Sequence, residues 1–96
     1  MLAIRMSKGA DDFLAKIPKK HAQQIVRKID AFAADQTSVQ SEQLAGYPTL
    51  KRLKSGEYRV IFSIENNVLE VHILRIGKRN DGEVYRNLED LQNTTL

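Results

Sequence analysis

The clearest indication of the fold in this 96-residue sequence is LKRLKSGEYRVIFSI, residues 50–64. Its Ser55-Gly56 pair is a turn signal that divides it into two candidate strands, residues 50–54 and 58–64. The second candidate is rich in β-branched and aromatic residues, which favour strands. Because the connection is so short, we expect the two strands to pair as an antiparallel hairpin.

Further elements follow the hairpin along the chain. A second short turn leads into a third strand, residues 68–76, which extends the hairpin into an antiparallel meander. Gly77 is expected to break this strand. Val84, Leu88 and Leu91 are then spaced so that a short terminal helix could turn all three toward the sheet.

The sequence before the hairpin predicts one strand and two helices. Alternating apolar residues over positions 2–6 indicate a short strand, and Ser7 is a suitable N-cap for the first helix. Pro18 separates that helix from a second, clearer one. The apolar stripe of the second helix consists of Ala22, Ile25, Val26, Ile29, Phe32 and Ala33. Residues 35–48 are polar and are expected to form a long loop.

The predicted element order is therefore β-α-α-β-β-β-α, an α+β fold in one domain over residues 1–96. The helical hairpin is expected to pack on one face of a mainly antiparallel sheet. The other sheet face would then stay partly open, and a functional site is expected there.

Composition excludes several classes of site and location. The chain has no cysteine, which removes thiol nucleophiles, disulfides and cysteine-based zinc sites, and its two histidines stand far apart. We therefore expect neither a metal nor a cofactor. The longest strongly apolar stretch is too short to span a bilayer, and the N-terminus lacks a signal-peptide core. A cytoplasmic protein without membrane contact is expected.

Basic side chains concentrate in the second half of the chain. Residues 51–79 hold seven Lys or Arg against three Asp or Glu, whereas residues 80–96 hold one against four. The seven are Lys51, Arg52, Lys54, Arg59, Arg75, Lys78 and Arg79. Such a block suggests a site for a polyanion, and a solvated basic surface is the alternative.

Strand geometry groups some of these residues. Period-two alternation places Arg52 and Lys54 on one face of their strand and Lys51 on the other. Pairing across the hairpin turn would bring Arg59 beside the first two. Like charges placed close together destabilise a sheet, so this clustering favours an anionic ligand. Edge-strand lysines that discourage aggregation are the alternative for Lys51 and Lys54.

Two histidines and one tyrosine complete the candidates. His21 lies among lysines at a helix start and is expected on the surface. His72 lies within a strand and is expected to be a structural or exposed histidine, with a role as base near the basic block as the alternative. Tyr85 is either a core residue or a ring on which an RNA base stacks.

Three segments of the sequence resemble a known family. GYPTLKRLKSGEYRVIFSI (46–64), VLEVHILRIGKRNDGEVY (68–85) and KIPKKHAQQIVRKI (16–29) are similar to the RelE/ParE superfamily of toxins from type II toxin–antitoxin systems. The resemblance covers nearly the whole chain. It implies a RelE-like fold.

The C-terminal pattern R-x-x-x-x-V-Y, met by Arg79, Val84 and Tyr85, favours the RelE-like branch of the superfamily. That branch implies a ribosome-dependent endoribonuclease that cleaves mRNA in the A site of the 30S subunit. By analogy, Arg52, Lys54, Arg59, Arg79 and Tyr85 would be the catalytic residues. Lys51, Arg75 and Lys78 are assigned to RNA binding. This chain departs from the RelE prototype at three positions. The prototype typically has lysines on the strand where this chain has Leu50 and Arg52, and a basic residue where it has Ala45.

The expected chemistry is metal-free attack of the RNA 2′-hydroxyl on the adjacent phosphorus. Guanidinium groups of Arg59 and Arg79 suit the developing phosphorane charge. Arg52 remains protonated and is a poor proton acceptor, which leaves Lys54, Lys51 or His72 as the candidate base.

Two other functions remain open. The first is a ParE-like inhibitor of DNA gyrase, which acts by protein–protein contact and is not an enzyme. The second is a degenerate member that only binds its antitoxin. The resemblance implies a RelB-like antitoxin as partner in every case, with operator DNA contacted only through that antitoxin.

Overall fold

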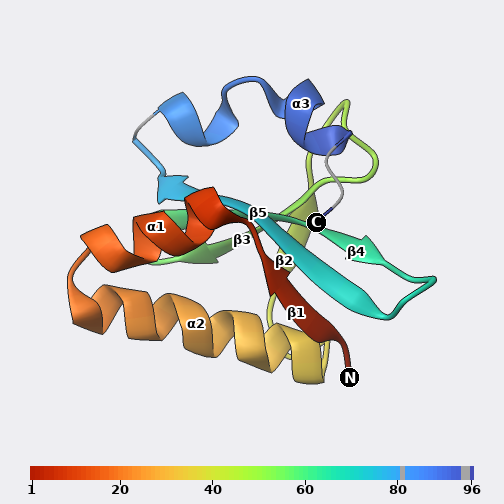
Figure 1. Ribbon diagram of the computed structural model, residues 1–96, viewed down its shortest axis with the longest axis horizontal. Coiled ribbons are helices and arrows are strands. Elements are labelled where there is room, and N and C mark those ends of the chain that lie inside the picture. Colours follow the sequence, from red (N-terminus) through yellow and green to blue (C-terminus); the bar gives the residue numbers. More distant parts are fainter. Residues whose placement is uncertain (81, 94–95) are drawn as a thin grey trace.

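The computed structural model describes residues 1–80, 82–93 and 96. Its elements are β1 (Ala3–Met6), α1 (Lys8–Lys16), α2 (Lys19–Ala34), β2 (Ser41–Gln43), β3 (Lys51–Ser55), β4 (Tyr58–Glu65), β5 (Glu70–Lys78), the 3₁₀ helix η1 (Gly82–Tyr85) and α3 (Leu88–Gln92). One five-stranded sheet has the order β1-β5-β4-β3-β2. Figure 1 shows the sheet between α1 and α2 on one side and the C-terminal segment, η1 and α3, on the other. The predicted α+β class is confirmed.

The sheet is mixed. β3, β4 and β5 form the predicted antiparallel meander, with Lys54 opposite Arg59 across the first turn. β1 instead pairs with β5 in parallel, with Ala3 opposite Glu70. A parallel neighbour needs a long connection. Here the chain leaves β1 through α1 and α2, reaches the far edge of the sheet at β2 and returns through β3 and β4 to β5.

The helices cover one sheet face as predicted. The Ser7 hydroxyl accepts a hydrogen bond from the Ala10 backbone N–H at 3.1 Å and caps α1. The stripe of α2 contributes Ile25, Ile29 and Phe32 to the core beneath the sheet. Burial of these large apolar side chains holds the helical layer in place.

The opposite sheet face is more covered than the sequence predicts. A second apolar cluster of buried residues occupies it: Leu44, Leu50, Ile61, Leu74, Val84 and Leu88. The C-terminal segment therefore closes over part of this face, as expected for Val84 and Leu88, and the segment before β3 adds Leu44. The part left open lies toward β2 and β3.

Two predictions about single elements are wrong. Ser41–Gln43 forms the edge strand β2 within the region expected to be loop, and it pairs antiparallel with β3. Gly77 does not break β5, which continues to Lys78. A Cβ on Gly77 would lie 2.9 Å from the Cβ of Val84, so the missing side chain lets η1 approach the sheet closely.

Candidate functional site: a guanidinium between a carboxylate and a phenol

Arg52 on β3 joins two polar groups from distant parts of the chain. Its Nη2 donates a hydrogen bond to Oε2 of Glu42 at 2.7 Å. Its Nη1 donates to the hydroxyl of Tyr85 at 2.9 Å, and its Cζ lies 5.8 Å from the centre of that ring. The strand register places Glu42 directly opposite Arg52, while η1 carries Tyr85 over the sheet from the C-terminal side.

These contacts change the ionisation of both charged partners. The Arg52 hydrogen bond, with the charge of nearby Lys54, lowers the pKa of Glu42 below its ordinary value. The hydrogen bond to Tyr85, followed by the one to Glu42, raises the pKa of Arg52 against the opposing effect of burial. At neutral pH the pair is therefore a guanidinium and a carboxylate.

Lys54 and Arg59 extend this cluster along the same sheet face. Nζ of Lys54 lies 3.4 Å from Oε1 of Glu42. Arg59, its neighbour across the hairpin, donates through Nη1 to the backbone carbonyls of Gly56 and Tyr58, both at 2.9 Å. Nη2 and Nε of Arg59 have no hydrogen-bond partner among the described residues, so both can donate toward a ligand. We call Glu42, Arg52, Lys54, Arg59 and Tyr85 the β3 cluster.

The remaining predicted residues lie around this cluster or away from it. The backbone N–H of Arg79 donates to the carbonyl of Glu57 at 2.7 Å, which puts the exposed Arg79 beside the turn between β3 and β4. Lys51 and Lys78 pair with Phe62 and Tyr58, two residues of the helix-side core, and so lie on the other sheet face.

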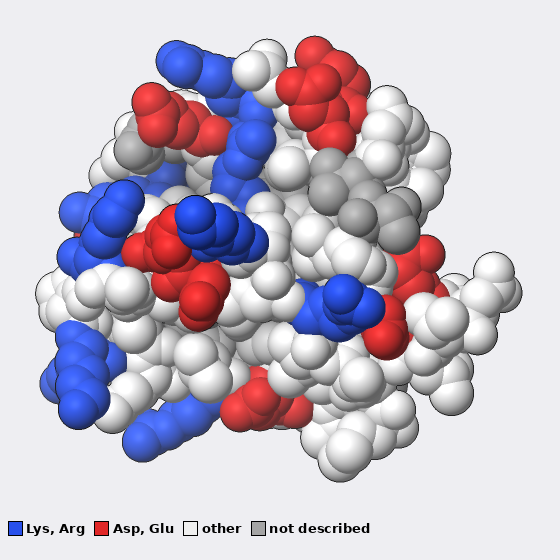
Figure 2. Space-filling view, in the orientation of Figure 1, with Lys and Arg blue, Asp and Glu red and all other residues white. Residues whose placement is uncertain are grey.

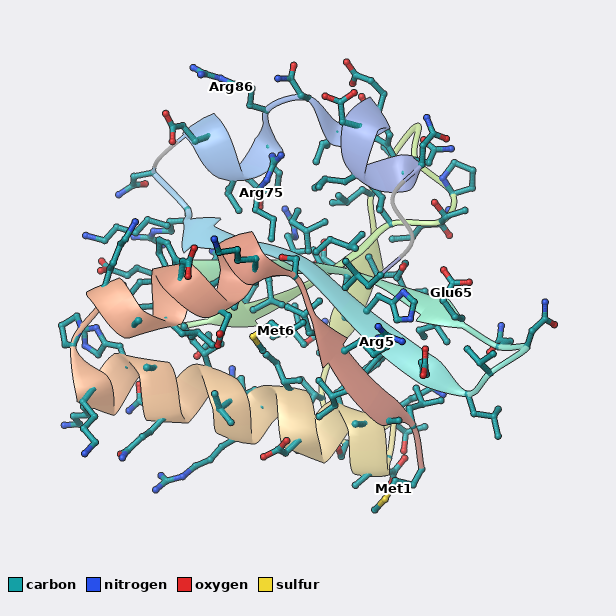
Figure 3. The ribbon with its side chains drawn as sticks, in the orientation of Figure 1. Met1, Arg5, Met6, Glu65, Arg75 and Arg86 are labelled. Atoms are coloured by element: carbon teal, nitrogen blue, oxygen red, sulfur yellow. The ribbon has the colours of Figure 1, made fainter. Side chains whose placement is uncertain are left out.

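Arg75, which the sequence assigns to RNA binding, has backbone partners in the structure. Figure 3 shows its side chain reaching from β5 toward the C-terminal segment. Its Nη1 donates to the carbonyl oxygens of Glu83 at 3.0 Å, Val84 at 3.3 Å and Arg86. This guanidinium is therefore engaged in tying η1 to the sheet.

His72 lies within a strand as predicted and is a structural residue, whereas His21 is less exposed than predicted. His72 is 2% exposed, and its Nε2 is 2.9 Å from Oε1 of Glu70, so it is enclosed rather than available as a base. His21 is half-buried instead of superficial, and its Nδ1 is 2.8 Å from the hydroxyl of Tyr58. The His21 ring therefore links α2 to β4, whereas His72 and its partner Glu70 both belong to β5.

Glu42 is the member of the cluster that the sequence analysis missed. It belongs to a polar run without strand character, and its relation to Arg52 depends on the pairing of β2 with β3. A cavity of about 170 Å³ adjoins it and is lined by Lys28, Val39, Gln40, Glu42, Arg52 and Lys54.

Two other kinds of functional feature, a metal site and a membrane span, were sought in the described residues. Within residues 1–80, 82–93 and 96, no group of three or more His, Asp or Glu side chains converges as metal ligands would. The same residues contain no helix with the length and apolar character of a bilayer span. Figure 2 shows basic and acidic side chains intermingled over the side of the molecule that it displays, along α1 and α2, so that side is not uniformly cationic.

Comparisons with known proteins agree with this architecture. The free form of a mutant Escherichia coli toxin RelE superposes with a TM-score of 0.77 at 17% identity, covering 94% of this chain and 96% of that one. The toxin–antitoxin complex RelBE2 of Mycobacterium tuberculosis gives 0.70 at 21% identity, with 81% and 98% covered. The archaeal RelE–RelB complex from Pyrococcus horikoshii gives 0.68 at 23% identity, with 82% and 96% covered. These likenesses establish the RelE-like fold.

A comparison with curated proteins found no match. The model of one protein family, described as the ParE toxin of the type II toxin–antitoxin system parDE, matches residues 4–82. This match spans most of the chain and both layers of the fold. The protein is therefore a type II toxin–antitoxin toxin that belongs to the ParE toxin family, within the RelE/ParE superfamily.

Proposed function

We propose that this toxin is a ribosome-dependent endoribonuclease that cleaves mRNA in the A site and so inhibits translation. The observation that carries the proposal is the β3 cluster, where the Arg52 guanidinium contacts the Tyr85 hydroxyl beside Lys54 and Arg59. Cationic groups next to an aromatic ring suit a phosphate and its flanking base.

The proposed reaction needs no nucleophile from the protein. The RNA 2′-oxygen attacks the adjacent phosphorus, and a 2′,3′-cyclic phosphate and a 5′-hydroxyl result. Catalysis then depends on alignment of the chain and on stabilisation of the charged phosphorane. The free donors of Arg59 and the exposed guanidinium of Arg79 would bind its oxygens, and Tyr85 would stack on a base.

The proposed partners are the ribosome with its mRNA and a RelB-like antitoxin. RelE toxins of the same fold have been solved in complex with RelB antitoxins, which supports an antitoxin partner here. Operator DNA would be reached only through that antitoxin, and the toxin would act in the cytoplasm. A chain of this size presents little surface for selecting RNA alone, so the ribosome would hold the message in register.

The test is primer extension on translated messages after brief induction, repeated with purified toxin and programmed ribosomes. Cuts within codons are expected in both. Arg59→Ala and Arg79→Ala should each reduce cutting by about 10²–10³-fold, as loss of one transition-state donor does. A message with 2′-deoxyribose at the cut site should stay intact. Wild-type rates in both arginine variants would refute their roles.

The family match supports a second candidate. ParE toxins are expected, from the resemblance, to inhibit DNA gyrase without being enzymes, and this chain belongs to the ParE toxin family. Supercoiling by purified gyrase separates the candidates. Trapped gyrase–DNA cleavage complexes together with intact mRNA would establish the second candidate and exclude the first.

A further inference from the structure

The carboxylate of Glu42 lies between two cationic side chains of β3. Arg52 contacts one of its oxygens at 2.7 Å, and Lys54 lies 3.4 Å from the other. The pairing of β2 with β3 fixes this position through the main chain, because Glu42 is the register partner of Arg52. A carboxylate held this way is oriented before any ligand arrives.

The other proton acceptors considered for RNA cleavage are poorly suited. Arginine stays protonated in proteins, which excludes Arg52. Nζ of Lys54 is engaged with the Glu42 carboxylate at 3.4 Å. Lys51 lies on the other face of the sheet. His72 is enclosed, and its Nε2 is engaged with Glu70.

Glu42 also faces a space in which a substrate could sit. The adjoining cavity of about 170 Å³ has three cationic side chains in its walls, from Lys28, Arg52 and Lys54, and Glu42 as its acid. Nζ of Lys28 donates to the backbone carbonyl of Lys54 at 2.6 Å, which keeps that ammonium at the wall. Pockets for drug-sized ligands measure roughly 300–1,000 Å³, so this one has room for a single ring.

We propose that Glu42 is the proton acceptor of the cleavage reaction and that the cavity beside it holds the ribose whose 2′-hydroxyl attacks. This inference rests on the proposed endoribonuclease function. The 2′-hydroxyl proton passes to the Glu42 carboxylate as the 2′-oxygen bonds to phosphorus. The bond from phosphorus to the 5′-oxygen breaks, that oxygen takes a proton from water, and Glu42 returns its proton to solvent.

Arg52 and Lys54 make the proton affinity of Glu42 depend on whether RNA is bound. In the free protein, Arg52 and Lys54 lower the pKa of Glu42, so the carboxylate is ionised at neutral pH. A bound phosphodiester shares the same two cations, which weakens their hold on the carboxylate. The proton affinity of Glu42 therefore increases once RNA is in place.

The test is single-turnover cleavage of an mRNA on programmed ribosomes, measured from acid to neutral pH. Glu42→Gln keeps an oxygen that can accept from Arg52 but cannot take up a proton. It should lower the rate about 10²–10⁴-fold and abolish the fall in rate at acid pH. Glu65→Gln is the matched control, because Glu65 lies at the far end of β4 (Figure 3) and should leave both properties unchanged.

A wild-type pH profile with two measurements sharpens the assignment. The acid limb of kcat/KM reports the free protein and that of kcat reports the complex. Because bound RNA shares Arg52 and Lys54 with Glu42, the fall of kcat at acid pH should occur at a higher pH than the fall of kcat/KM. With Glu42→Ala, added formate should restore cleavage in proportion to its ionised fraction, which a structural ion pair would not produce.

The possible results separate this inference from the proposed function. If wild-type toxin leaves ribosome-bound mRNA intact, both are wrong. If the wild type cleaves and Glu42→Gln cleaves equally fast with the same acid limb, only the role of Glu42 is refuted. Loss of the acid limb in Lys54→Ala, with its retention in Glu42→Gln, would assign the proton acceptor to Lys54 and also overturn the inference.

Discussion

Replacing Gly77 by alanine tests how the C-terminal segment is seated on the sheet. The new Cβ would lie 2.9 Å from Cβ and 3.1 Å from Cγ2 of Val84, and the nearest backbone atom, its Cα, is 3.6 Å away. Val84 is 2% exposed and belongs to the second apolar cluster. Because the Cα of Val84 is also only 3.6 Å from the new methyl group, relief of the contact requires η1 to shift.

The magnitude follows from two opposing effects. Overpacking a well-filled site costs about 1–3 kcal/mol. Replacing a glycine by alanine in the interior of a strand stabilises the folded state by roughly 0.5–1 kcal/mol. The free energy of unfolding of Gly77→Ala should therefore fall by about 0–2.5 kcal/mol. In a domain of this size, each kcal/mol shifts the Tm by about 4–8 °C.

Gly9→Ala is the matched control, because a Cβ at Gly9 in α1 meets nothing within 4 Å. That change should raise the free energy of unfolding by up to about 1 kcal/mol. Urea denaturation of both variants beside the wild type measures the difference. If Gly77→Ala proves at least as stable as Gly9→Ala, the close approach of η1 to β5 is refuted. Displacement of η1 should also weaken the Arg52–Tyr85 contact and reduce RNA cleavage.

Three further predictions concern single contacts. Arg75→Ala removes the guanidinium from the carbonyls of η1 and should destabilise the protein by about 1–3 kcal/mol, with faster amide exchange at Val84 and Leu88 than in the wild type. Tyr58→Phe removes the hydroxyl that meets Nδ1 of His21 and should cost about 0.5–1.5 kcal/mol in urea denaturation, whereas Tyr47→Phe should cost less. An NMR titration should find the pKa of Glu42 below its ordinary value, and Arg52→Ala should raise it. Because the folded-state pKa is the lower one, the contribution of this pair to stability is present at neutral pH and is lost as the pH falls through that pKa. An unchanged pKa in Arg52→Ala would contradict the assigned cause.

Local patterns accounted for most of the secondary structure. Three features could be predicted because each depends on neighbours within a few residues: the apolar stripe of α2, the Ser7 cap and the β-branched run in β4. β2 was not readable, since Ser41–Gln43 has no strand propensity and becomes a strand through its hydrogen bonds with β3. The prediction that Gly77 breaks β5 is wrong, because the role of this glycine depends on Val84, which packs against it from η1.

The candidate site divides in the same way. Arg52 and Lys54 share a face because side chains alternate along a strand, and the short turn pairs Lys54 with Arg59. These relations follow from the sequence. The sequence could not show that Tyr85 comes to lie on Arg52 or that Glu42 lies opposite Arg52, because both contacts depend on which segments become spatial neighbours.

The α+β class, the meander and the concentration of basic side chains follow from the amino-acid order alone, since periodicity, turn signals and charge act along the chain. Which of those side chains come together in the β3 cluster depends on how the strands and η1 are arranged in space. The strand order β1-β5-β4-β3-β2 brings Glu42 to Arg52, and the seating of η1 over the sheet brings Tyr85. The position of η1 over the sheet also brings the backbone carbonyl of Glu83 to Arg75, whose guanidinium binds the acceptors that packing places within its reach.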